Sequence, residues 1–148
     1  MEIKLIEDKQ SNLSVHIIYP VMDDRVNQLI HIIKGFDNRI VAMDDNKNIL
    51  LCGEDIFYIE SVERKTFLYT HNAVYRSPKK LYQFFGELAD NGFVQVSKSC
   101  LLNLNKLDSV KVLLNSRLEA TLVNGEKVII SRRYIPAIKQ WLDKGVCL

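Results

Sequence analysis

The residues best suited to a chemical role in this chain are Arg132 and Arg133. They follow an Asn-Gly pair and a short apolar run within residues 122–134. Asn-Gly between apolar runs is a strong hairpin signal, because such turns need residues that accept positive φ. The hairpin would hold both arginines at the end of a rigid strand. A rigidly mounted guanidinium suits phosphate or guanine recognition. The alternative is a solvated charge pair at the start of a helix.

Two further apolar segments each lead into a polar, basic turn. Residues 56–62 are followed by Glu63 and then by Arg64, Lys65 and Thr66. Residues 93–96 are followed by a second group, which consists of Ser97, Lys98 and Ser99. Lysine and serine bind phosphates well, whereas arginine can read guanine O6 and N7 together. A polyanion is therefore a ligand that all three segments could share.

The charge distribution favours a localised site over a generally basic surface. The 148-residue chain has a net charge of only +2. Residues 1–40 hold five Lys/Arg against six Asp/Glu, and residues 41–148 hold fifteen against twelve. Basic segments on a nearly neutral protein indicate focused polyanion binding rather than non-specific coating. The three histidines are far apart and no glycine-rich phosphate loop occurs, so we expect no cofactor, no metal and no enzymatic activity.

The pattern of apolar residues divides the chain at residue 38. Residues 3–7 and 14–19 are typical of strands, and 23–34 of a helix whose apolar face comprises Val26, Leu29, Ile30 and Ile33. We expect residues 1–38 to form a β-β-α extension that is too small to fold alone. Its apolar helix face either packs on the main domain or mediates a dimer contact, and we favour packing on the main domain that also supports a dimer. Residues 39–148 form the main domain. It consists mostly of short strands, with helices at 78–89 and 135–144 and a helical turn or short helix within 97–104.

The three basic segments, in their order and spacing, closely resemble the LytTR family of DNA-binding domains over roughly residues 39–145. The resemblance implies a mainly β (α+β overall) fold, a stack of small antiparallel sheets with short helices. It also implies that loops read duplex DNA in successive major grooves, usually at tandem repeat sites. The contacting positions it implies are Arg64, Lys65, Thr66, Ser97, Lys98, Ser99, Arg132 and Arg133. Many members carry His-Arg-Ser at the second segment. The Ser97-Lys98-Ser99 sequence here therefore favours phosphate contact over guanine readout.

The same resemblance implies a transcription regulator that stands alone, since residues 1–38 leave no room for a receiver domain. Its partners would be double-stranded DNA, a second copy in a homodimer, and a small membrane protein of the kind that often accompanies such regulators. No segment approaches the length of a membrane span, no signal peptide is evident, and three scattered cysteines indicate a reducing cytoplasm. Two other hypotheses remain: a protein-interaction module that does not bind DNA, and a redox sensor that uses Cys52 or Cys100.

Overall fold

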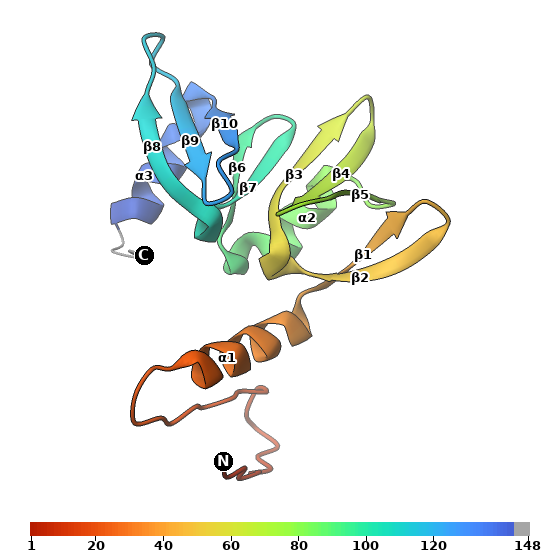
Figure 1. Ribbon diagram of the computed structural model, residues 1–148, viewed down its shortest axis with the longest axis vertical. Helices are drawn as coiled ribbons and strands as arrows, with labels where there is room; N and C mark the ends of the chain where they lie inside the picture. The colour runs from red at the N-terminus through yellow and green to blue at the C-terminus, as the bar shows by residue number, and fades with distance from the viewer. Residues whose placement is uncertain (144–148) are drawn as a thin grey trace.

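A seven-stranded antiparallel sheet forms the centre of the computed structural model, which describes residues 1–143. Its strand order is β2-β1-β5-β4-β3-β7-β6. The strands are β1 (Arg39–Asp44), β2 (Lys47–Cys52), β3 (Ile56–Val62), β4 (Lys65–Thr70), β5 (Val74–Ser77), β6 (Phe93–Ser97) and β7 (Cys100–Asn103). Helix α2 (Leu81–Leu88) covers one face of this sheet (Figure 1). Its buried Phe84 and Leu88 pack with Ile56, Ile59 and Leu68 in the first core.

A second, three-stranded sheet stands beside β6 and β7 and encloses a second core (Figure 1). Its order is β10-β9-β8, formed by β8 (Leu107–Val112), β9 (Leu118–Leu122) and β10 (Lys127–Ile130). Helix α3 (Ile135–Asp143) contributes the fully buried Ile138 to this core. The last residue of the helix predicted at 135–144, Lys144, lies outside the described residues. The mainly β fold class predicted from the sequence is confirmed.

Short 3₁₀ turns join neighbouring elements, and the turn that follows β7 lies at the seam between the two cores. They are η1 (Gly53–Asp55), η2 (Ala89–Asn91), η3 (Leu104–Lys106) and η4 (Arg132–Tyr134). Asn103, 1% exposed, fixes this seam. Its Nδ2 donates to the Ile56 carbonyl at 2.9 Å, and its Oδ1 accepts from Asn105 N at 3.1 Å. Both halves of the buried amide are therefore satisfied, as burial of a polar side chain requires.

The segment from 97 to 104 differs from its prediction. We expected a helical turn, but Cys100–Asn103 forms strand β7, paired with β3 on one side and β6 on the other. All four residues of β7 are buried. A strand buried on both faces shows no alternation of polar and apolar residues, so its short apolar run cannot be distinguished from a buried helical turn by periodicity.

The N-terminal region also differs from its prediction. Residues 1–23 form no strand, so the strands expected at 3–7 and 14–19 are absent, whereas the helix forms as α1 (Asp24–Asp37). Asp23 caps this helix by accepting from Val26 N at 3.0 Å. A two-stranded ribbon without further strands is marginally stable in water, which accounts for the missing strands. Figure 1 places residues 1–23 beside α1 and away from both sheets.

Candidate nucleic-acid interface

The turn between β3 and β4 is a two-residue hairpin connection with unusual backbone angles. Val62 pairs directly with Lys65, and the two residues between them, Glu63 and Arg64, have φ values of 50° and 65°. Two consecutive left-handed residues correspond to a type I′ turn, which normally selects Asn and Gly. A charged residue held there against steric preference indicates a functional demand on the turn.

Arg64 and Lys65 are exposed at this turn, but Thr66 is not. Thr66 is 2% exposed and pairs with Ser77 of β5 inside the sheet. The structure therefore presents the first two predicted residues together and separates the third from them. For Thr66, a role in supporting the hairpin fits its burial better than a direct DNA contact.

Lys80, which is not among the positions predicted from the sequence, joins this group. Its Nζ donates to the Arg64 carbonyl at 3.2 Å, while its backbone N–H donates to Gln83 Oε1 at 2.7 Å. Neighbouring Lys79 instead forms an ion pair with Glu87 at 2.8 Å. The one available sequence signal was a cation at a helix N-terminus, where the helix dipole disfavours it.

The turn between β6 and β7 is held by its two serines. Ser97 Oγ accepts from Ser99 N at 3.2 Å, and the Ser99 carbonyl accepts from Ser61 N of β3 at 2.8 Å. Both serines are half-buried, whereas the Lys98 side chain is exposed. Among the three residues predicted here, Lys98 is thus the one that projects into solvent.

Arg132 and Arg133 lie in η4, directly after β10. The Asn-Gly turn predicted before them is present, although only Gly125 has a positive φ, at 87°. Ser131 N donates to the Val96 carbonyl at 2.9 Å, so β6 fixes the exit of β10. The Arg133 guanidinium lies 6.0 Å from the ring centroid of Tyr134, which packs against the second core. Both arginine side chains are exposed and mounted on a rigid support, as predicted.

Backbone pairing brings the three basic turns to one end of the molecule. The Ser61–Ser99 hydrogen bond joins the first turn to the second, and the Ser131–Val96 bond joins the second to the third. The exposed cations gathered there are Arg64, Lys65, Lys98, Arg132 and Arg133. Within residues 1–143, the ion pairs found involve none of these side chains. Their positive charge is therefore not neutralised by the ion pairs of the described side chains and is available to a polyanion.

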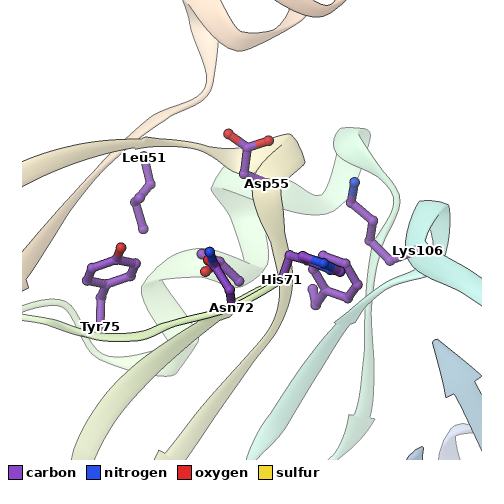
Figure 2. A pocket seen from close by; sticks show the side chains of 8 residues that line it. Leu51, Asp55, His71, Asn72, Tyr75 and Lys106 are labelled. Atoms are coloured by element: carbon purple, nitrogen blue, oxygen red, sulfur yellow. The ribbon is translucent and has the colours of Figure 1, made fainter. Parts of the chain in front are cut away.

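The opposite end of β3 and β4 carries a cleft with mixed chemistry. Its volume is about 490 Å³, and Figure 2 shows Asp55, His71, Tyr75 and Lys106 around it. Lys106 Nζ lies 5.3 Å from the ring centroid of the buried Phe57. Phe57 lies next to the first residue of β3 and Arg64 follows the strand's end, so the cleft and the basic turns are separated by about the length of a strand. The cleft marks the seam between the two cores.

The environment of Cys100 does not favour a redox role for this thiol. Cys100 is 6% exposed, and burial together with nearby Glu60 raises its thiol pKa to about 12. A thiol with so high a pKa is protonated near neutral pH and therefore a poor nucleophile. In the part of the chain that the structure describes, no cluster of three or more His, Cys, Asp or Glu residues suits a metal ion. None of the described helices is both long and apolar enough to span a membrane.

Comparison with known proteins connects this geometry to a family of regulators. The chain is 24% identical to the sensory transduction protein LytT of Enterococcus faecalis, over 90% of this chain and 61% of that protein. It is 32% identical to the transcriptional regulatory protein YpdB of Escherichia coli O6:H1, over 62% of this chain and 34% of that protein. The chain thus spans less than two thirds of either relative. An uncharacterized HTH-type transcriptional regulator of Staphylococcus aureus MSSA476 is 22% identical over 93% of this chain and 95% of that protein.

A solved structure shares the fold. It is the LytTr DNA-binding domain of a putative methyl-accepting/DNA response regulator from Bacillus cereus, which matches with a TM-score of 0.67 at 19% identity. The match covers 71% of this chain and 96% of that one. The family model of the LytTr DNA-binding domain matches residues 46–143, which include all three basic turns. The chain therefore belongs to the LytTr DNA-binding domain family of transcription regulators.

Proposed function

We propose that the protein binds duplex DNA sequence-specifically through its three basic turns, and that two copies bind together at tandem repeat sites. The observation that supports this most directly is the cluster of exposed cations at one end of the molecule, without carboxylate partners in the described chain. An antiparallel scaffold that fixes its turns by backbone hydrogen bonds limits the entropy lost when those turns meet DNA. A small membrane protein as a regulatory partner remains a suggestion of the family resemblance.

Arg133 is the proposed base reader. Its guanidinium projects from a 3₁₀ turn anchored to β6 and lies beside the Tyr134 ring. That mounting restricts the orientation of the planar group, which a bidentate contact with guanine O6 and N7 requires. Arg132 is proposed to contact the DNA backbone.

Lys98 and the residues of the β3–β4 turn are proposed to bind phosphates. Lys98 projects from a turn held by Ser97 and Ser99, and an ammonium group is a point charge that suits a phosphate oxygen. Arg64 and Lys65 project from the neighbouring turn. Phosphate contacts fix the register of the protein on DNA and carry no direct sequence information.

The test separates these two roles. We first select a binding site from random duplex DNA, and then titrate each variant against that site and a scrambled duplex at two salt concentrations. Arg133→Ala should cost about 1–3 kcal/mol on the selected site and flatten preference at one base position. Arg133→Lys should not restore it. Lys98→Ala should weaken both duplexes alike and reduce the salt slope by about one.

Lys79→Ala is the matched control, because Lys79 is an exposed lysine already paired with Glu87. It should leave both affinities unchanged. If Arg133→Ala lowered both affinities equally, Arg133 would be a phosphate contact and not a base reader. If the unaltered protein bound no duplex better than the scrambled one, sequence-specific binding would be refuted.

A further inference from the structure

The contacts described between helix α1 and the β domain lie on one side of the helix. His31 Nδ1 lies 2.7 Å from Glu54 Oε2 in η1, and Gly35 is buried against the Cys52 side chain. With about 100° between successive residues, His31 and Gly35 lie on the same side of the helix. The apolar residues Leu29 and Ile33 lie on the opposite side, directed away from η1. The sequence expectation that this face packs on the main domain therefore has no support in these contacts.

The apolar side of α1 is incompletely covered within one chain. Val26, Leu29, Ile30 and Ile33 are half-buried and belong to neither core. Along the edge of the same arc, Ile32 and Phe36 are 67% and 69% exposed. Figure 1 places residues 3–22 beside α1, and the large apolar side chains of this segment are also exposed, with Leu5, Leu13 and Ile18 between 86% and 98% exposed. Exposed apolar side chains that are concentrated in one segment of a soluble protein indicate a surface that meets a partner.

We propose that this surface, formed by α1 and residues 3–22 and called here the N-terminal apolar surface, is the interface on which a second copy of the chain docks. The two α1 helices would pack antiparallel about a two-fold axis. The proposal extends the proposed function. It rests on that function in one respect, namely that two copies bind together at a tandem site. A two-fold interface uses the same patch on both copies, and an amphipathic helix with an uncovered apolar side can supply such a patch.

Charge complementarity favours the antiparallel arrangement. Asp23 caps the N-terminal end of α1, and Lys34 lies in its last turn. The two ends of the helix therefore carry opposite side-chain charges, the acidic one at the N-terminal end and the basic one at the C-terminal end. In an antiparallel pair, each Asp23 faces the Lys34 of the other copy. The helix dipoles are then also opposed, which is the favourable orientation.

The available area is sufficient for a stable dimer. A large apolar side chain carries on the order of 100 Å² of apolar surface. The exposed apolar side chains between Ile3 and Phe36 then offer roughly 800 Å² per copy, which is the amount that a standard stable interface buries on each partner.

The location of the surface leaves the DNA-binding end accessible. Helix α1 meets the domain at η1, which immediately precedes β3, whereas Arg64 follows the end of β3. The seven residues of β3 span about 23 Å at about 3.3 Å per residue. Two copies joined through α1 can therefore direct their basic turns away from the interface and toward DNA.

The test measures the oligomeric state of the full chain in the absence of DNA, by sedimentation velocity over a range of concentrations. The unaltered protein should sediment as a dimer of twice its 17.1 kDa mass. The double variant Ile32→Ser/Phe36→Ser should raise the dissociation constant about 100-fold. Leu50→Ser is the matched control, because Leu50 is 61% exposed on strand β2, outside the surface; it should remain dimeric. Unfolding curves confirm that each variant is folded.

A second variant tests the antiparallel arrangement, and a second assay separates this proposal from DNA binding. Lys34→Glu should weaken the dimer at low salt, with most of the loss recovered at high salt because screening removes the repulsion. The Ile32→Ser/Phe36→Ser variant should bind a single repeat with unchanged affinity and lose cooperativity on two repeats. A monomeric unaltered protein, or equal dissociation of the Leu50→Ser control, would overturn the interface. Failure of the unaltered protein to bind a single repeat would instead overturn the proposed function.

Discussion

Replacing Arg64 with glycine should stabilise the protein while weakening its binding to DNA. Arg64 has a φ of 65°, and left-handed backbone costs a residue with a side chain roughly 1–2 kcal/mol. Glycine removes that cost but adds about 0.5–1 kcal/mol of conformational entropy to the unfolded chain. The net gain in the free energy of unfolding should be about 0.5–1 kcal/mol, which corresponds to a rise in Tm of about 2 °C for a chain of this size.

The same substitution removes one of the clustered cations. Lys80 donates to the backbone carbonyl of residue 64, so that contact survives in the glycine variant and the loss is confined to the guanidinium. The slope of log K against log salt should become shallower by about 0.9. Arg64→Ala should show the same loss of DNA affinity without the gain in stability, because alanine retains the steric cost.

Differential scanning calorimetry and titration with the selected duplex give the two readouts. Asp45→Gly is the matched control, because Asp45 has a φ of 51° in the β1–β2 turn, outside the three basic turns. It should gain similar stability with no loss of DNA affinity. A less stable Arg64→Gly protein would show that the turn is not strained. Unchanged DNA affinity in both Arg64 variants would show that this guanidinium does not contact DNA.

Further predictions concern salt, thiol reactivity and alkaline pH. Four or five phosphate contacts per copy predict a salt slope near −4, and binding that is insensitive to salt would refute the electrostatic interface. At pH 8, iodoacetamide should modify half-exposed Cys52 and leave Cys100 unmodified until the protein unfolds; peptide mapping after brief alkylation checks this. Burial and nearby Glu126 raise the pKa of the Tyr58 hydroxyl above its usual value. Its contribution to stability is therefore present below about pH 10 and is lost as pH rises further, so Tyr58→Phe should show a shallower alkaline decline in Tm.

Local turn and strand signals in the sequence predicted much of the β domain. The Asn124-Gly125 hairpin formed where expected, since an Asx side chain and a glycine carry their turn preference with them. In the structure, Asn124 Oδ1 accepts from Glu126 N at 3.1 Å, and Gly125 alone takes the left-handed conformation. Arg132 and Arg133 could be placed on a rigid support because their mounting depends on this adjacent hairpin.

Features that depend on contacts between distant segments could not be predicted in this way. The role of Lys80 arises from a hydrogen bond to a residue sixteen positions away. The burial of Thr66 depends on β5 lying beside β4. Strand β7 is buried by both of its neighbours, so its sequence lacks the alternation that identifies a half-exposed strand. In each case the contact comes from a segment that the fold brings close in space. Local sequence patterns do not specify such contacts.

The places where this chain breaks local rules are informative about its function. Glu63 and Arg64 occupy turn positions that favour Asn and Gly, and the ion pairs found among the described side chains do not involve the cations around them. Each of these two features lowers the stability of the isolated chain. Binding of a polyanion at that end would neutralise the clustered cations and offset the free energy lost in the turn. The exposed Ile32 and Phe36 of α1 form a third violation, at the other end of the molecule. Because a phosphate backbone cannot relieve exposed apolar surface, that violation requires a different partner, and a second copy with the same surface supplies one.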